Sequence, residues 1–241
     1  MVGRFRKIAR SMGFDIARYP GAAAQWPRLT EMLNQHNVSL VLDVGANIGQ
    51  YAVSLRNNGY TERIVSFEPL SSAHADLSAN ADLDPAWDVA PRCAVGAAAG
   101  ETEINISPES DMSSLLALTD DAAEKFASVR PTASESVPVT TLATELPRYA
   151  NANDTIFVKS DTQGYEAQVL TGLAGAVDRV IGLQLELSLV PIYQGQPDYL
   201  SVLNQVNELG FTPHLIIPGY FSRHHRQMIE FDVVCFRVST S

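Results

Sequence analysis

The sequence predicts an α/β fold with a largely parallel sheet, because short β-branched runs alternate with helical stretches from Val38 onward. Seven runs have the pattern of strands: Leu40 to Val44, Arg63 to Phe67, Trp87 to Val95, Thr155 to Ser160, Val180 to Glu186, His214 to Ile217 and Phe231 to Val238. Helices are expected between them at Gln50 to Asn58, Ser71 to Ala81, Glu166 to Leu173 and Asp198 to Leu209, the last of which ends at Gly210. Right-handed crossovers should place these helices on both faces of the sheet.

The composition fits one sizeable domain. The chain has 241 residues, of which 46% are hydrophobic, and this length can bury one large α/β core. Its two cysteines, Cys93 and Cys235, lie far apart and lack the spacing of a metal site or a disulfide framework. Both are therefore expected to be reduced core residues of a cytoplasmic protein.

Charge and hydropathy argue against a nucleic-acid partner and against a membrane-spanning segment. A net charge of -10 would repel the phosphates of a nucleic acid before local contacts formed. No run approaches the roughly 18 apolar residues that span a bilayer, and residues 1–20 lack the continuous apolar core of a signal peptide. The sequence therefore predicts a protein that has no transmembrane segment and is not exported.

Two segments stand apart from the α/β pattern. Residues 1–37 form an N-terminal basic segment, in which apolar residues recur at helical spacing. This pattern predicts a short amphipathic helix that either caps the domain or makes weak contact with a membrane surface. Within the domain at 38–241, an insertion at about 101–142 has alternating runs around a Ser-rich centre, which predicts a flap over the ligand edge of the sheet. The bases of the first segment are Arg4, Arg6, Lys7, Arg10 and Arg18, and its apolar residues are Phe5, Ile8 and Met12.

The first strand runs into the stretch VLDVGANIGQY, from Val41 to Tyr51, which indicates a ligand site. Gly45 and Gly49 let the backbone approach a ligand closely, and the helix that starts at Gln50 has free amide donors. The stretch lacks both the G-x-G-x-x-G of nicotinamide-binding folds and the G-x-x-x-x-G-K-[ST] of ATP-binding loops. A nicotinamide-dependent oxidoreductase is therefore a weak alternative.

The second strand is followed by Glu68, about twenty residues after the first strand end, where an acid can accept both hydroxyls of an adenosine ribose. Pro69 fixes the chain that follows, so that Leu70 can form a wall for the adenine ring. Ligands of open parallel sheets bind beyond the carboxyl ends of the strands. The two strand ends therefore predict one shared nucleoside site.

These residues resemble the FkbM-type S-adenosylmethionine-dependent methyltransferases. DVGANIGQY is similar to that family's first cofactor motif, D-x-G-A-N-x-G, and SFEP resembles its second. CAVGAAAG, from Cys93 to Gly100, and KSDTQGYE, from Lys159 to Glu166, resemble two further motifs. QLELSL and FDVVCFRV extend the likeness to residues 38–238. One departure is that Ser160 and Thr162 flank Asp161, where the family usually has apolar residues.

The resemblance implies a Rossmann-like class I methyltransferase fold, with seven strands, helices on both faces and a last strand that is antiparallel and inserted beside the fifth. It also implies S-adenosyl-L-methionine as the cofactor, lying across the strand ends. The residues expected to bind it are Asp43, Gly45, Asn47, Gly49 and Gln50 around the amino-acid end, Glu68 at the ribose, Pro69, Leu70, Ala94 and Val95 at the adenine, Ser113 and Ser114 as a cover, and Asp161 near the methyl group.

Methyl transfer to an alcohol needs a base for the hydroxyl proton, and two acids and three histidines are candidates. Asp161, at the end of the fourth parallel strand, is the first, and Glu186, at the end of the fifth, is the second. The remaining candidates are His214, His224 and His225, of which His224 and His225 lie in the polar hairpin GYFSRHHRQM. A divalent metal between the two acids is an alternative, but two carboxylates are few for a complete site, so no metal is expected.

The expected activity is transfer of a methyl group to a hydroxyl of a sugar, glycolipid or polyketide-like natural product, so the partner would be a small-molecule, glycan or glycolipid acceptor. The alternatives are an N-methyltransferase of the same fold and a non-catalytic module that binds S-adenosyl-L-methionine. The identity of the acceptor depends on loops whose conformations the sequence does not determine.

Overall fold

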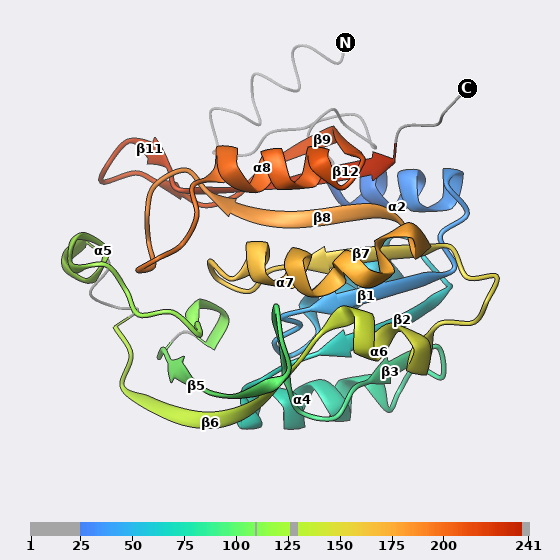
Figure 1. Cartoon of the computed structure of the whole chain (residues 1–241), viewed down its shortest axis with the longest axis horizontal. Coiled ribbons are helices and arrows are strands. Elements are labelled where there is room, and N and C mark those ends of the chain that lie inside the picture. Colours follow the sequence, from blue (N-terminus) through green and yellow to red (C-terminus); the bar gives the residue numbers. More distant parts are fainter. Residues whose placement is uncertain (1–24, 109, 126–129, 238–241) are drawn as a thin grey trace, which may run out of the picture.

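Seven strands form the central sheet, in the order β3-β2-β1-β7-β8-β12-β9 (Figure 1). The computed structural model describes residues 25–108, 110–125 and 130–237. All neighbouring strands are parallel except β12, which runs antiparallel between β8 and β9. The expected seven-stranded sheet with its antiparallel last strand is confirmed. The strands are β1 (Leu40–Val44), β2 (Arg63–Phe67), β3 (Trp87–Val89), β7 (Ile156–Ser160), β8 (Val180–Ser188), β9 (Phe211–Pro218) and β12 (Glu230–Arg237).

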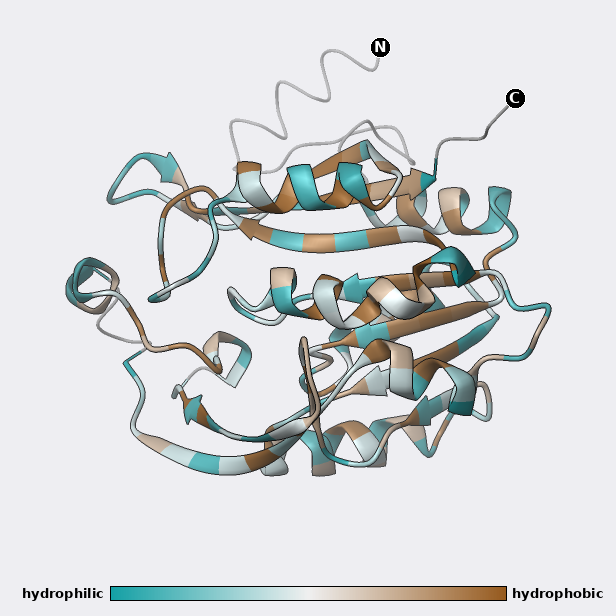
Figure 2. Cartoon of the chain, in the orientation of Figure 1, coloured by the Kyte–Doolittle hydropathy of each residue, from teal (hydrophilic) through white to brown (hydrophobic). Residues whose placement is uncertain are grey.

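Helices cover both faces of this sheet. On one face lie α2 (Gln25–Gln35), α3 (Gln50–Asn57) and α4 (Ser71–Ala81), and on the other lie α6 (Leu142–Tyr149), α7 (Glu166–Leu173) and α8 (Tyr199–Glu208). The strands are apolar along most of their length, as Figure 2 shows, because each side of a central parallel strand packs against helices. β1 is buried at every residue, and its alternate side chains belong to the two separate cores.

Local signals explain where several helices begin. Asp198 caps α8 by accepting the N–H of Ser201 at 3.0 Å, and Thr141 caps α6 by accepting the N–H of Thr144 at 3.2 Å. α2 buries Leu29 and Leu33, which lie one turn apart and join the core beneath α3. The helix therefore belongs to the same packed unit as the sheet.

The segment before α6 forms a second sheet, in the order β4-β6-β5. Its strands are β4 (Ala94–Val95), β5 (Gly100–Ile106) and β6 (Ala133–Thr140), with η1 (Ser110–Met112) and α5 (Asp120–Lys125) between β5 and β6. The expectation of one strand from Trp87 to Val95 is wrong, because β3 pairs with β2 whereas Ala94 pairs with Val139 of β6. Pro91 lies between the two and cannot donate a ladder hydrogen bond, so the chain changes sheets there.

The remaining elements are η3 (Ala174–Arg179) before β8 and a short hairpin of β10 (Phe221–Ser222) and β11 (Gln227–Met228). The amphipathic helix expected near the N-terminus lies outside the described residues. Within the part of the chain that the structure describes, no helix has the length and apolar character needed to cross a bilayer.

Candidate active site

A cavity of about 290 Å³ opens across the C-terminal ends of the central strands, which are called the strand tips below. Residues at the tips of β1, β2, β7 and β8, together with β12, line it, and so do α2 and the first turns of α3. The segment 110–115 of the insertion contributes further lining residues. Since open parallel sheets bind ligands at this edge, the cavity is the candidate site.

The turn after β1 explains the spacing of Gly45, Asn47 and Gly49. All three residues have a positive φ, of 74°, 49° and 94° respectively. Glycine adopts this region freely, and asparagine is among the other residues that tolerate it best. A β-carbon on Gly45 would lie 1.8 Å from the carbonyl oxygen of Asp161. A larger residue would therefore force the tips of β1 and β7 apart.

α3 begins directly after this turn and has no side-chain cap at Gly49, so the amides of its first turn remain available as donors. Gln50 lines the cavity, as expected. Gly49 is absent from the cavity lining, and a β-carbon there would lie 2.4 Å from the ring of Trp87. Gly49 thus allows α3 to pack closely against Trp87.

Glu68 follows β2, and the backbone engages both of its carboxylate oxygens. Oε2 accepts the N–H of Asn47 at 2.7 Å, and Oε1 accepts the N–H of Leu70 at 2.8 Å. Burial raises the pKa of this carboxyl to about 7, although the two hydrogen bonds oppose the shift. Each oxygen has a further lone pair, so Glu68 can hold the turn and still accept a hydroxyl group in the cavity that it lines.

An apolar wall continues from Glu68 onto the second sheet. Pro69, Leu70, Ala94 and Val95 all line the cavity, as the sequence indicates. Cys93 lies in the same wall, and both cysteines are free and buried. Such a wall suits a flat ring that carries few polar atoms on its faces.

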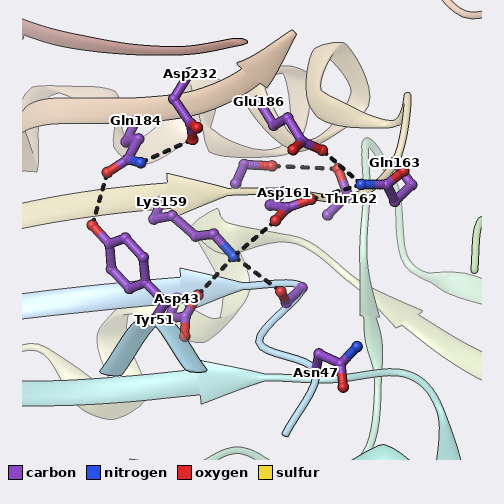
Figure 3. A network of polar contacts seen from close by, with 12 residues as sticks. Asp43, Asn47, Tyr51, Lys159, Asp161, Thr162, Gln163, Gln184, Glu186 and Asp232 are labelled. Atoms are coloured by element: carbon purple, nitrogen blue, oxygen red, sulfur yellow. Dashed lines mark hydrogen bonds and ion pairs between the residues drawn. The ribbon is translucent and has the colours of Figure 1, made fainter. Parts of the chain in front are cut away.

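A row of polar side chains crosses the sheet just before the tips, and Figure 3 shows its members Asp43, Lys159 and Gln184. The row consists of Ser66, Asp43, Lys159 and Gln184, which are register partners on the adjacent strands β2, β1, β7 and β8. All four residues are buried, so their polar groups need partners within the protein. This row is called the polar row below.

Lys159 is the centre of the polar row. Its ammonium lies 3.1 Å from Asp43 Oδ1, 3.0 Å from the carbonyl oxygen of Gly45 and 3.6 Å from Asp161 Oδ2. Burial acts to lower the pKa of Lys159, but the neighbouring acids raise it above its ordinary value. Burial raises the pKa of Asp43, and Lys159 opposes this shift. Asp43 is absent from the cavity lining, so it acts on the site through Lys159.

Asp161 and Glu186 are joined by the side chain of Gln163 (Figure 3). Its Nε2 donates to Asp161 Oδ1 at 3.0 Å and to Glu186 Oε2 at 2.6 Å, and its Oε1 accepts the hydroxyl of Tyr193 at 2.8 Å. Burial, together with Asp161 and Glu230, raises the pKa of Glu186 well above its ordinary value. The two acids indicated by the sequence are thus brought together, but only Asp161 lies beside a cation.

A second branch connects α3 to β8 and β12. The hydroxyl of Tyr51 donates to Gln184 Oε1 at 2.9 Å, and Gln184 Nε2 donates to Asp232 Oδ1 at 2.9 Å (Figure 3). Burial raises the pKa of Asp232 to about 6. The Lys159 ammonium lies 5.4 Å from the centre of the Tyr51 ring, within the range of a cation–π contact.

The insertion is attached to both sides of the cavity. Asn47 Nδ2 donates to Ser110 Oγ at 3.0 Å, and Ser114 Oγ donates to the carbonyl oxygen of Gln163 at 2.6 Å. Ser113 and Ser114 both line the cavity, as expected of a cover. The segment is therefore held to the turn after β1 and to the tip of β7.

The structure does not bring His225 to the cavity. His224 and His225 lie between β10 and β11, with their ring centres 4.7 Å apart, and neither is among the residues that line the cavity. His214 is exposed on β9 and packs against Phe236. His224 and His225 belong to the hairpin of β10 and β11, which lies between β9 and β12 in the chain. Residues that are close to a strand tip in the sequence therefore need not reach the cavity.

Several residues that line the cavity were not indicated as such by the sequence, among them Trp26, Lys159, Gln163, Gln184 and Asp232. A signal existed for Lys159, because a lysine within the apolar strand FVKS is rarely buried without a partner. Gln163 lies within the motif KSDTQGYE, which the sequence already indicates. The position of Asp232 depends on the register of β12 against β8, which no local pattern gives.

Among the described residues, no group of three or more His, Cys, Asp or Glu side chains has an arrangement that could hold a metal ion.

A model of the FkbM methyltransferase domain matches residues 43–213, which include the turn after β1, Glu68, the second sheet and the tips of β7 and β8. The chain belongs to the FkbM methyltransferase family. This FkbM protein is a methyltransferase. Its strand order is that of the expected Rossmann-like class I fold.

Solved structures with a similar chain path are methyltransferases of several kinds. An FkbM methyltransferase from Methylobacillus flagellatus KT is 16% identical, with a TM-score of 0.49 over 82% of this chain and 44% of that chain. Magnesium protoporphyrin IX methyltransferase from Synechocystis PCC 6803, with bound SAM, is 10% identical, with a TM-score of 0.47 over 89% of this chain and 78% of that chain. A 1,6-didemethyltoxoflavin-N1-methyltransferase from Burkholderia thailandensis is 11% identical, with a TM-score of 0.48 over 90% and 80%. No curated protein matches the sequence significantly.

Proposed function

We propose that this enzyme is an O-methyltransferase whose acceptor is a hydroxyl of a sugar, a glycolipid or a polyketide-like natural product. The observation that supports this is the pair Asp161 and Glu186, which share the side-chain amide of Gln163 beside the cavity. An alcohol loses its proton as it is methylated, and a carboxylate within reach of the acceptor can take that proton.

S-adenosyl-L-methionine fits the half of the cavity between β2 and β7. Glu68 would accept the ribose hydroxyls, Leu70 and Val95 would pack against the adenine, and the uncapped first turn of α3 would donate to the cofactor's carboxylate. Among the described residues, the lining holds five carboxylates and one ammonium, which suits a sulfonium cation. When bound, the cofactor supplies an electrophilic methyl group.

Asp161 is the proposed base. Its Oδ2 lies 3.6 Å from the Lys159 ammonium, and its carboxylate would receive the hydroxyl proton. Burial, together with Asp161 and Glu230, raises the pKa of Glu186 well above its ordinary value, and the protonated form of Glu186 can donate a hydrogen bond to the acceptor. Such different surroundings for neighbouring acids suit different roles in proton transfer. Holding the acceptor in line with the methyl group would contribute up to roughly 7 to 11 kcal/mol more.

Calorimetry with S-adenosylhomocysteine tests the cofactor site. We expect the wild type to bind and Glu68→Ala to lose most of its affinity, because the ribose hydroxyls lose their acceptor. Asp76→Ala, which removes an exposed carboxylate from α4, is the matched control and should bind as the wild type does. Unchanged affinity in Glu68→Ala would remove Glu68 from the ribose site.

Methyl transfer from labelled cofactor to extracted glycolipids tests the reaction. Asp161→Asn preserves the shape of the side chain but cannot take a proton, so we expect normal binding of S-adenosylhomocysteine and a loss of turnover of about 100- to 10,000-fold. Turnover that persists in Asp161→Asn would reject Asp161 as the base. A wild type that binds the cofactor and transfers no label would favour a non-catalytic module.

A further inference from the structure

The cavity continues beyond the half assigned to the cofactor. Its second half, called the α2 pocket below, is lined by Trp26 on α2, Tyr51 on α3, Gln184 and Glu186 on β8, and Asp232 on β12. These strands lie on the far side of β7 from Glu68, because the sheet order places β8 and β12 beyond β7. A cofactor that spans from β2 to β7 would therefore end where the α2 pocket begins.

Aromatic rings form one side of the α2 pocket. Trp26 is partly buried, and its ring meets that of Tyr51 edge-on with centres 5.5 Å apart. The Tyr51 ring is itself held in place by the hydrogen bond from its hydroxyl to Gln184. Trp26 thus presents a large, fixed surface with an apolar body, which can pack against a ring of an acceptor.

The rest of the α2 pocket is polar and acidic. Asp161, Glu186 and Asp232 line it, and Gln184 completes it. Lys159 is the one cationic side chain among the described residues that line the whole cavity, and its ammonium already contacts Asp43 and the carbonyl of Gly45. An anion in the α2 pocket would thus find carboxylates and no free cation.

We infer that the α2 pocket is the acceptor subsite, and that it takes an uncharged or cationic hydroxyl-bearing ring packed on Trp26 and rejects acceptors with a phosphate, sulfate or carboxylate on that ring. This inference rests on the proposed function, since the cofactor must fill the other half of the cavity. The carboxylates can accept hydrogen bonds from hydroxyl or amine groups of the ring, which selects for such acceptors. A buried anion beside like charges loses its hydration without gaining a partner, which selects against acceptors that carry a phosphate, sulfate or carboxylate.

Tryptophan fluorescence tests the inference, because the chain has two tryptophans and Trp87 is buried with its N–H bonded to Ser66. The protein is first saturated with S-adenosylhomocysteine and then titrated with a matched pair of probes, hexyl β-glucoside and hexyl β-glucuronide, which differ by one carboxylate. We expect the glucoside to change the emission of the wild type but not that of Trp26→Phe. The glucuronide should bind at least about tenfold more weakly.

Gln25→Arg provides a second measurement that does not depend on removing a packed side chain. Gln25 lines the cavity next to Trp26, and an arginine there would add the missing cation. We expect this variant to bind the glucuronide more tightly than the wild type does. Its preference for the glucoside over the glucuronide should fall to about threefold or less.

Three outcomes would overturn the inference. They are equal or tighter binding of the glucuronide by the wild type, no response of Trp26 to either probe, and an unchanged preference in Gln25→Arg. Failure of the proposed function is seen separately, because it appears as a lack of S-adenosylhomocysteine binding by calorimetry before any probe is added.

Discussion

Replacing Lys159 by methionine should strongly destabilise the fold. The change keeps most of the volume of the side chain but removes an ammonium 3.1 Å from Asp43 Oδ1, and Asp43 has no exposed surface. At that distance and an effective dielectric constant of 20, the attraction between two unit charges is about 5 kcal/mol. Removing one partner of a buried pair typically costs 3 to 5 kcal/mol, so we expect Lys159→Met to lose about 3 to 5 kcal/mol of unfolding free energy.

Urea unfolding followed by circular dichroism measures this loss, and the double variant Asp43→Asn/Lys159→Met is its control. The double variant removes both charges and should be clearly more stable than Lys159→Met. The single variant should also recover stability as the pH falls, because Asp43 without its cation has a pKa raised further above that of the unfolded chain and is destabilising while ionised. A loss below about 1 kcal/mol, or a double variant no more stable than the single, would refute the role of the pair.

Further predictions concern the turn after β1, Glu68, and the hydrogen bond between Tyr193 and Gln163. Gly45→Ala should unfold at a much lower urea concentration than Gly59→Ala, because both residues have a positive φ but a β-carbon on Gly59 meets nothing within 4 Å. The control, Gly59→Ala, should lose only about 1 to 2 kcal/mol of unfolding free energy. Equal losses in the two variants would contradict the close approach of the tips of β1 and β7. Affinity for S-adenosylhomocysteine should rise roughly tenfold from pH 6 to pH 8 in calorimetry, because Glu68 has a pKa of about 7 and only its ionised form would accept both ribose hydroxyls. Glu68→Gln should remove this rise. A wild-type affinity that does not change with pH would count against the role of Glu68. Tyr193→Phe should lose about 1 to 3 kcal/mol in urea unfolding, because Gln163 Oε1 is left without its donor, and an unchanged midpoint would show that the hydrogen bond contributes little.

Local patterns in the sequence were sufficient for much of the fold. The bounds of β1, β2, α4 and α7 agree with the expected ones, because each of these elements is an apolar run or a helical stretch bounded by turn residues. The structure also gives a reason for Asn47, whose positive φ of 49° falls between two glycines that share that backbone region. Glu68 lines the cavity, and its position follows from the end of a strand, while its role at the ribose stays a prediction.

What the sequence did not indicate depends on pairing between distant segments. Ala94 leaves the central sheet because Val139 offers it a partner more than forty residues later. Gln184 enters the site because β8 pairs with β7 in the register that places it beside Lys159. Asp232 enters it because β12 pairs with β8 in the register that places it opposite Glu186. Trp26 carries no local signal at all, and it reaches the cavity only because α2 packs on α3.

Synthesis of the chain delivers the two charges of the Asp43–Lys159 pair at different times. β1, β2 and β3 leave the ribosome first, with Asp43 still hydrated, and the second sheet and α6 follow before Lys159 is made. Burying a lone carboxylate is costly, so a compact sheet of these first three strands is disfavoured until β7 has been made and pairs with β1. The ion pair therefore links closure of the core to completion of the second half of the chain, and nascent chains that stop short of β7 should remain open to proteases.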